Sequence, residues 1–146
     1  MRYQEPKEID MQNMTIDEIR EYRNQYNHFA NLIGLTITEM GEGYGITRMT
    51  ITDQMRNPVG SVHGGAIATT ADVAGGSAAS TLGHPVTTLD CSLHYLRPGL
   101  KDCTEIIGKG TVIKGGRRVI VTDVEVTSQD GTVLARGIYT YATLDS

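Results

Sequence analysis

The sequence predicts an α+β fold in which an antiparallel sheet curls around one long helix. Three observations carry this prediction. Residues 64–82 contain almost only Gly, Ala, Ser, Thr and small aliphatic residues, over a length that suits a helix. Residues 33–52 and 86–143 instead alternate apolar and polar side chains with the period of two expected of strands. Strands that are segregated from a single apolar helix are typical of a sheet that packs on that helix.

Composition limits the classes of function. A length of 146 residues suits one domain, 1–146, and 13 Lys and Arg against 17 Asp and Glu give a net charge of −4. Broad electrostatic capture of nucleic acid or of an anionic membrane is therefore disfavoured. The charged N-terminus lacks the apolar core of a secretory signal, which predicts a cytoplasmic protein. The two cysteines, Cys91 and Cys103, fit no disulfide framework and are expected to be reduced and partly buried.

The chain begins with a helical extension, residues 1–30. Thr15 and Glu18 have the spacing of a capping box, and apolar residues recur at helical intervals from Ile16 to Phe29, which predicts one amphipathic helix. The period then changes to two, with a turn at 41–43 between strands at 33–37 and 46–52. These strands are expected to form a hairpin, followed by a loop over 53–62.

The long helix, 64–82, has no charged face and is expected to be buried nearly all round. It is too weakly apolar, and too poor in flanking Trp and Tyr, for a transmembrane span. Gly75 and Gly76 lie inside it, where each costs about 1 kcal/mol relative to Ala, which is tolerable where the helix must approach a sheet closely.

Four strands follow. In 86–96, alternation places Leu89, Cys91, Leu93 and Tyr95 on one face and Thr88, Asp90, Ser92 and His94 on the other. The strands 104–114, 118–128 and 132–143 are expected to form a meander. Its two connections are Gly115-Gly116, suited to positive φ, and Asp130-Gly131.

Asp72 is the ionisable residue within the long helix. A buried charge costs several kcal/mol unless it is hydrogen-bonded, paired or functional. Its structural alternative is a carboxylate bonded to local backbone or to a hydroxyl such as that of Thr69. Burial alone leaves both interpretations open.

A second candidate lies just before the helix, in the segment from Asn57 to Gly65. Gly64 and Gly65 at a helix start would let a ligand approach bare backbone, where unpaired N–H groups carry the positive end of the helix dipole. The alternative is an ordinary loop-to-helix turn in which Asn57 and His63 only shape the loop.

The spacing of these two features implies an oligomer. Eight residues separate Gly64 from Asp72, which is about 12 Å along a helix axis at 1.5 Å per residue. One substrate carbonyl cannot touch both groups of the same chain. If both serve one reaction, they come from two copies of the chain related by a two-fold axis.

Other kinds of site lack their motifs. The four histidines have no zinc-ligand spacing, so no metal is expected. The sequence contains no GxSxG elbow, no GxxxxGK[ST] phosphate loop and no GxGxxG after a strand.

Two segments together resemble the PaaI-type branch of the hotdog-fold acyl-CoA thioesterases. NPVGSVHGGAIATTADVAGGSAAS is similar to the family's loop and central helix, with Asn six residues before the HGG histidine and the acid nine after it. VTTLDCSLHYLRPG is similar to the strand that follows. Gly76 departs from an aryl-CoA branch that carries Thr there and Glu as the acid, and Thr88 stands where Ser is frequent.

The resemblance implies a six-stranded antiparallel hotdog sheet around residues 64–82. It also implies a homodimer that often doubles to a tetramer, with the site across the dimer. Gly64 N–H would be the oxyanion donor, Asn57 would place the carbonyl or water, and Asp72 of the other subunit would be general base or nucleophile. Thr88 would hold water beside that acid, and His63 would fix the loop.

The implied substrate is an acyl-CoA, which is hydrolysed without a further cofactor. Gly65 and the basic residues are the candidate substrate contacts, the latter facing the coenzyme A phosphates: Arg97, Lys101, Arg117 and Arg118. The rival hypothesis is a non-catalytic acyl-CoA-binding or regulatory protein on the same scaffold. A dehydratase or isomerase would want a His–acid pair placed differently.

Overall fold

The structure, a computed structural model, describes residue 2 and residues 9–144. The first eight residues of the expected extension, apart from residue 2, lie outside the described part of the chain, as do residues 145–146. The elements are η1 (Met11–Asn13), α1 (Ile16–Tyr26), α2 (His28–Leu32), β1 (Leu35–Gly41), β2 (Tyr44–Thr50), η2 (Asp53–Met55), α3 (Gly64–Ser80), β3 (Val86–Tyr95), β4 (Glu105–Gly115), β5 (Val119–Ser128) and β6 (Val133–Thr143).

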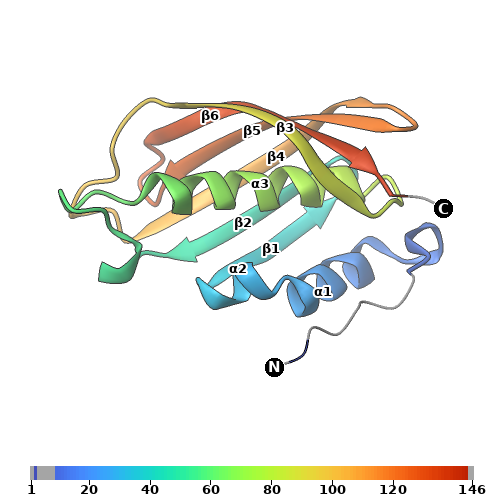
Figure 1. Ribbon diagram of the computed structural model, residues 1–146, viewed down its shortest axis with the longest axis horizontal. Coiled ribbons are helices and arrows are strands. Elements are labelled where there is room, and N and C mark those ends of the chain that lie inside the picture. Colours follow the sequence, from blue (N-terminus) through green and yellow to red (C-terminus); the bar gives the residue numbers. More distant parts are fainter. Residues whose placement is uncertain (1, 3–8, 145–146) are drawn as a thin grey trace.

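One six-stranded sheet curves around α3 (Figure 1), in the order β1-β2-β4-β5-β6-β3. Every neighbouring pair is antiparallel, and β4, β5 and β6 form the expected meander. This arrangement confirms the α+β hotdog fold. Among the described residues, no helix is long and apolar enough to cross a membrane.

Helix α3 lies against the sheet and is buried along most of its length. Its buried hydroxyl groups donate hydrogen bonds to carbonyls of the helix itself: Thr70 donates to Ala66 O at 2.8 Å and Ser77 to Val73 O at 2.6 Å. A buried hydroxyl that donates to the carbonyl one turn back has its own donor paired. The small residues also let strands approach, since a methyl group built on Gly75 would lie 2.8 Å from Thr122 Oγ1 of β5.

The described part of the N-terminal segment contains, after η1, the two α-helices α1 and α2, so the prediction of one continuous helix is wrong. The capping box of Thr15 and Glu18 is present at the start of α1. The break falls at Asn27, whose ψ of 81° is not helical and whose Oδ1 accepts from Ala30 N at 3.2 Å. An Asn that caps the next helix through its own side chain ends the first, because its backbone leaves the helical region.

Helix α1 also covers the outer edge of β1. The side-chain amide of Asn24 exchanges two hydrogen bonds with the backbone of Ile37, donating to its C=O and accepting from its N–H, both at 2.9 Å. The Asn24 amide thus occupies the position of a strand partner. Unpaired edges invite association with other chains, and here one of the two edges of the sheet is blunted.

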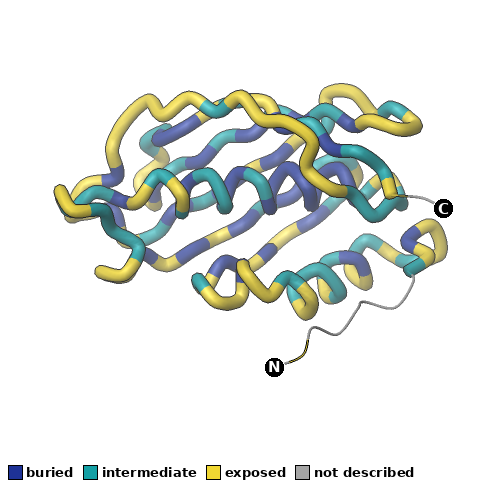
Figure 2. Tube along the Cα trace, viewed as in Figure 1, coloured by how far each residue is buried: buried dark blue, intermediate teal, exposed yellow. Residues whose placement is uncertain are grey.

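Strand β3 forms the other edge and is exposed along most of its length (Figure 2). Its register against β6 shifts between Thr88 and Asp90, so Leu89 is an extra residue. The bulge reverses the alternation, because one inserted residue moves the preceding side chains to the opposite face. Thr88 therefore lies on the face of Tyr95, toward α3, and its predicted place on the other face is wrong.

Two smaller expectations also need correction. β4 extends to Gly115, so the β4–β5 connection is 116–118, and neither glycine has positive φ. A methyl group on Gly116 would run into Val119 O, so the turn requires space rather than an unusual φ. The turn glycine Gly131 does have positive φ, 86°.

Both cysteines are free; Cys103 is buried, whereas Cys91 is exposed on β3 rather than partly buried.

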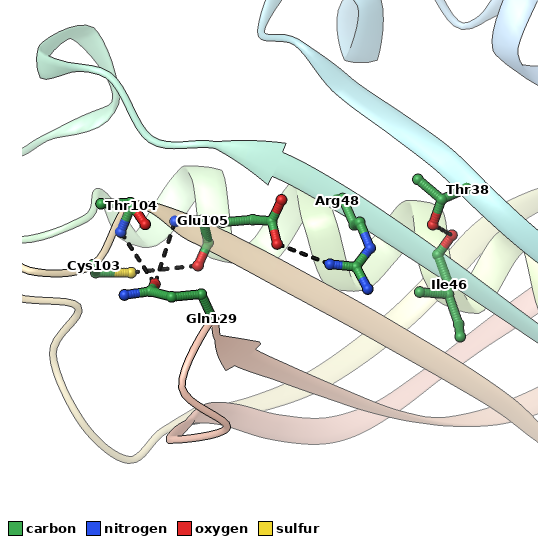
Figure 3. A network of polar contacts seen from close by, with 7 residues as sticks. All are labelled: Thr38, Ile46, Arg48, Cys103, Thr104, Glu105 and Gln129. Carbon is green, nitrogen blue, oxygen red and sulfur yellow. Dashed lines mark hydrogen bonds and ion pairs between the residues drawn. The ribbon is translucent and has the colours of Figure 1, made fainter.

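A polar network fixes the chain where it enters β4 (Figure 3). Gln129 Oε1 accepts from the backbone N–H of Thr104 at 3.1 Å, and Gln129 Nε2 donates to Asp102 O at 2.7 Å. Nearby, Arg48 of β2 pairs with Glu105 of β4 at 2.8 Å. The loop before β4 is thereby attached to the β5–β6 turn.

Candidate active site

Asp72 lies on α3, partly buried, and its carboxylate is held from one side. Oδ1 accepts from Thr88 Oγ1 of β3 at 2.7 Å, and the hydroxyl of Tyr141 on β6 lies 3.1 Å from the same oxygen. The Tyr141 hydroxyl also lies 2.7 Å from the backbone C=O of Asp72. No hydrogen bond reaches Oδ2 from the described residues. The carboxylate is therefore oriented through one oxygen, with the other available to a substrate or water.

The structural alternative, a carboxylate bonded to a hydroxyl, is met by Thr88 and Tyr141 rather than by Thr69. Thr69 Oγ1 donates to Gly65 O at 2.8 Å instead. Thr88 donates directly to the carboxylate. The role that the resemblance implies for it is different, because there Thr88 would hold a water molecule beside the acid.

Tyr141 is buried, with 2% of its surface exposed. Burial raises its pKa far above the ordinary value, and the neighbouring Asp72 raises it further. Since loss of a proton is disfavoured in both ways, the phenol remains a hydrogen-bond donor to Asp72. Tyr139, also on β6, donates to Ala68 O of α3 at 3.1 Å and fixes the same stretch of helix.

The start of α3 presents a free backbone donor. His63 is the N-cap residue, and its Nδ1 accepts from Gly65 N at 2.8 Å. Nδ1 then carries no proton, so in the neutral imidazole the N–H lies at Nε2. Gly64 N–H has no acceptor among the described residues, as expected in the first turn of a helix. Tyr95 of β3 donates to Gly64 O at 3.0 Å and holds this turn in place.

The two HGG glycines thus differ. The N–H of Gly65 is taken by His63, and a methyl group on Gly65 would lie 3.0 Å from His63 Nδ1. Gly65 allows the histidine to cap the helix, whereas the Gly64 N–H remains open at the positive end of the helix dipole.

Asn57 shapes the loop before α3. Its Oδ1 accepts from Val59 N at 3.2 Å and from Ser61 N at 3.0 Å. The side-chain oxygen is therefore used within the loop. Of the Asn57 side chain, only the Nδ2–H groups are left for a ligand.

Arg56, which sequence reasoning missed, ties this loop to the one before β4. Its guanidinium donates to Gly60 O at 2.9 Å, Leu100 O at 3.1 Å and Cys103 O at 3.0 Å. Because one guanidinium donates to carbonyls of both loops, it fixes the two loops relative to each other. A single Arg in a loop gives no sequence signal of such a role, because the carbonyls that it binds belong to residues 60 and 100–103.

The four basic candidates do not gather at one place in a single chain. Arg97 and Lys101 lie in the loop that packs against the start of α3, where Val62 N donates to Gly99 O at 2.8 Å. Arg117 and Arg118 lie at the far end of α3, beside Gly115, on which a methyl group would lie 2.9 Å from Leu82 of the helix's C-terminal turn. All four side chains are exposed.

The helix α3 is continuous from Gly64 to Ser80, so the free N–H and Asp72 are separated by about 12 Å along it. Among the described residues, no three His, Cys, Asp or Glu side chains come together in a group that could hold a metal ion. The chemistry available is that of a carboxylate, hydroxyl donors and a backbone N–H.

Comparison with known proteins gives one consistent result. Residues 59–135 match the model of the thioesterase superfamily. The chain is 32% identical over 106 residues to acyl-coenzyme A thioesterase PaaI of Escherichia coli K12, covering 73% of this chain and 75% of that protein.

Solved structures agree. The E. coli PaaI protein superposes with a TM-score of 0.78 at 25% identity, covering 88% of this chain and 96% of that one. A hypothetical thioesterase from Streptococcus pneumoniae TIGR4, solved with coenzyme A, gives a TM-score of 0.70 at 28% identity, covering 77% and 90%.

Proposed function

The chain belongs to the thioesterase superfamily, and we propose that it hydrolyses the thioester of an acyl-coenzyme A to a free acid and coenzyme A. The observation that carries this proposal is the carboxylate of Asp72, which is oriented through Oδ1 by two hydroxyl donors and left open at Oδ2. The similarity to acyl-CoA thioesterases supports the substrate class. The reaction needs no cofactor.

The reaction begins with the thioester carbonyl at the N–H of Gly64. The negative charge that develops on the carbonyl oxygen is stabilised by this donor and by the helix dipole. The amide N–H groups of Asn57 and the Nε2–H of His63 lie on the adjoining loop and cap, where they position the thioester.

Asp72 acts on the other side of the carbonyl. As general base, Oδ2 takes a proton from water while the water oxygen bonds to the carbonyl carbon; the C–S bond then breaks and the thiolate takes that proton. As nucleophile, Oδ2 bonds to the carbon directly while the C–S bond breaks and the thiolate leaves; water then hydrolyses the resulting anhydride to the Asp72 carboxylate and the free acid, and the thiolate takes the proton that this hydrolysis releases. In both routes, Thr88 and Tyr141 hold Oδ1 while Oδ2 reacts.

The site is proposed to form across a homodimer, because Gly64 and Asp72 of one chain are too far apart along α3. Two copies pair through β3, the sheet edge left open after Asn24 has covered β1. β3 exposes 57% of Leu89 and 54% of Tyr95, apolar surface that such pairing would bury. Two dimers would form the tetramer that the resemblance implies.

The coenzyme A phosphates are proposed to bind Arg97, Lys101, Arg117 and Arg118, exposed cations on a chain of net charge −4. Since these pairs lie at opposite ends of α3, both can serve one substrate only if each chain contributes one pair. Exposed contacts of this kind are screened by salt. Alanine at both Arg117 and Arg118 should raise KM more than it lowers kcat.

The proposal is tested with Asp72→Asn, assayed by thiol release from a panel of acyl-CoAs. Loss of the base should lower kcat by about 10²–10⁴-fold. The matched control is Glu42→Gln, an exposed acid in the turn between β1 and β2, which should retain activity. Near-wild-type turnover by the Asp72→Asn variant, with the oligomer intact, would overturn the assignment.

The non-catalytic alternative is tested on the wild-type protein with the same acyl-CoAs. An acyl-CoA-binding or regulatory protein would show a thermal shift with acyl-CoA and release no thiol over hours. That outcome, in the wild-type protein, would replace hydrolysis with binding.

A further inference from the structure

Strand β3 contacts both halves of the site, near its two ends. Thr88 donates to Asp72 Oδ1 at 2.7 Å, and Tyr95 donates to Gly64 O at 3.0 Å. If Gly64 of one chain and Asp72 of another serve one thioester, Thr88 of one strand has to lie level with Tyr95 of the partner subunit. The register in which two β3 edges pair therefore decides whether a site forms.

This condition fixes where a two-fold axis crosses β3. Counted along β6, Thr88 and Tyr95 lie opposite residues 141 and 135, because the bulge at Leu89 adds one residue to β3. The position midway between these two on β6, 138, lies opposite Ser92. An axis through Ser92 thus places Thr88 of each chain opposite Tyr95 of the partner subunit.

The backbone of β3 permits an axis at this residue. The C=O of Ser92 points to β6, since a methyl group built on Gly137 would run into Ser92 O. Successive residues of an antiparallel strand direct their N–H and C=O groups to alternate sides, so those of Cys91 and Leu93 point to the open edge. Cys91 of each chain can then exchange both backbone hydrogen bonds with Leu93 of the partner subunit, and the two Ser92 residues form the narrow pair between them.

The charges on the outer face of β3 are symmetric about the same residue. Asp90 and His94 lie two residues to either side of Ser92, on the face turned away from α3, and both are exposed. A two-fold axis at Ser92 brings Asp90 of each chain opposite His94 of the partner subunit. The edge is therefore complementary in charge to a second copy of itself.

Neither group is neutralised within its own chain. Asp90 lies opposite Thr140 of β6, and no hydrogen bond or ion pair reaches its carboxylate from residues 9–144. His94 lies opposite Arg136, whose guanidinium is paired with two acids of β5 at 3.5 and 4.0 Å. The described contact of the imidazole is with the Ser92 hydroxyl, 3.4 Å from Nε2. An acid and a base of the same edge are thus both available to a partner.

We propose that β3 pairs with β3 of a second copy in the register centred on Ser92, with Asp90 of each chain bound to His94 of the partner subunit. An imidazole ring donates an N–H to a carboxylate in either protonation state, and two-fold symmetry forms the contact twice. The inference rests on the proposed function and deepens it, because it specifies the contacts that bring the two halves of each site together.

Neighbouring registers meet neither condition. An axis at Cys91 or at Leu93 displaces every partner by two residues, about 7 Å at 3.4 Å per residue. Asp90 would then face Ser92 or Leu96 of the partner subunit, and neither side chain is charged. Thr88 would lie about 7 Å out of step with the partner's Tyr95, too far for one carbonyl to reach both halves of the site. The site and the charges require the same register independently.

Disulfide crosslinking reads the register directly. Ser92→Cys in a Cys91→Ser background should give covalent dimers on mild oxidation, because Cα atoms of such a narrow pair lie about 4.5 Å apart, within disulfide reach. The matched controls are the native Cys91 and Leu93→Cys, the latter in the same background. Each can link to its own copy only if the axis passes through it, so both should remain single chains on a non-reducing gel.

The dimer dissociation constant tests the charge pair, by analytical ultracentrifugation. His94→Asp places two acids opposite each other and Asp90→His places two bases, so each should raise the constant about tenfold over the two symmetric contacts. The two exchanges combined restore an acid opposite a base and should recover most of the loss. Glu42→His, in the exposed turn between β1 and β2, is the control and should leave the constant unchanged.

The outcomes separate this proposal from hydrolysis. Covalent dimers through Cys91 or Leu93→Cys, with none through Ser92→Cys, would overturn the register while hydrolysis stands. No crosslink at any of the three positions would overturn β3 as the interface. A combined exchange no better than either single one would overturn the charge pair. Crosslinking through Ser92→Cys in a protein whose wild type cleaves no acyl-CoA would overturn hydrolysis and retain the register.

Discussion

Replacing Gly75 with alanine is expected to destabilise the protein, although alanine is the better helix former. Helix propensity alone favours Ala by about 1 kcal/mol. The structure opposes this gain, because a methyl group at position 75 would lie 2.5 Å from Tyr141 Oη, 2.8 Å from Thr122 Oγ1 and 3.1 Å from Val124 Cγ1. All three side chains belong to buried strand residues that have little room to move.

The magnitude follows from two costs. Overpacking a core costs about 1–3 kcal/mol. Displacing the Tyr141 hydroxyl from Asp72 also weakens a buried hydrogen bond, which contributes about 1 kcal/mol. After the gain in propensity is subtracted, Gly75→Ala should lower the free energy of unfolding by about 1–3 kcal/mol.

Urea unfolding followed by circular dichroism, at one fixed protein concentration, measures this change. Gly76→Ala is the matched control, because its methyl group meets the flexible end of Arg23 at 3.0 Å and should cost less. Tyr141→Phe added to Gly75→Ala removes the closest contact and should recover at least about 0.5 kcal/mol beyond additivity. A Gly75→Ala protein more stable than wild type would refute the reasoning.

Three further changes are expected to have defined effects. Asn24→Ala removes both hydrogen bonds to Ile37 and should lower the free energy of unfolding by about 1–3 kcal/mol; an unchanged urea midpoint would mean that the β1 edge needs no cover. Thr88→Val keeps the shape but not the donor to Asp72, so steady-state assays should show kcat about tenfold lower at similar KM, and an unaltered kcat would contradict the orienting role. Hydrogen bonds within its turn lower the pKa of Asp130 from 3.8 to about 2, so its stabilising contribution is complete above about pH 4 and is lost toward pH 2. The stability gap between wild type and Asp130→Asn should therefore close over that range, and a constant gap would exclude this cause.

Much of the fold could be predicted because it depends on patterns local to each segment. The uncharged run from Gly64 onward, the strand alternation and the Thr15–Glu18 capping box each specify an element without reference to the rest of the chain. Asp72 also stood out, because a single charge in such a run requires a partner or a role.

What could not be predicted depends on contacts between distant segments. The bulge at Leu89, which turns Thr88 toward Asp72, exists because β6 supplies one residue fewer than β3 at that point. Sequence alternation alone gives no account of such a register shift.

Arg23 is a different case, because its signal was present. It interrupts an apolar face of α1 at the position where a core residue is expected, as Asp72 does on α3. That its guanidinium lies against Gly76 of α3 follows only from the packing of α1 beside α3.

Whether each site takes Gly64 from one chain and Asp72 from another is tested by mixing two inactive variants. Asp72→Asn removes the acid. Gly64→Pro removes the backbone donor and should preserve the helix, since proline is favoured at the first helical position and His63 before it is extended, with ψ of 134°.

Co-refolding the two variants in equal amounts makes half of the dimers mixed, and each mixed dimer carries one intact site of two. Thiol release per chain should therefore recover to about a quarter of the wild-type value. If the mixture stays as inactive as its components while mixed dimers are present, Gly64 and Asp72 do not act across chains.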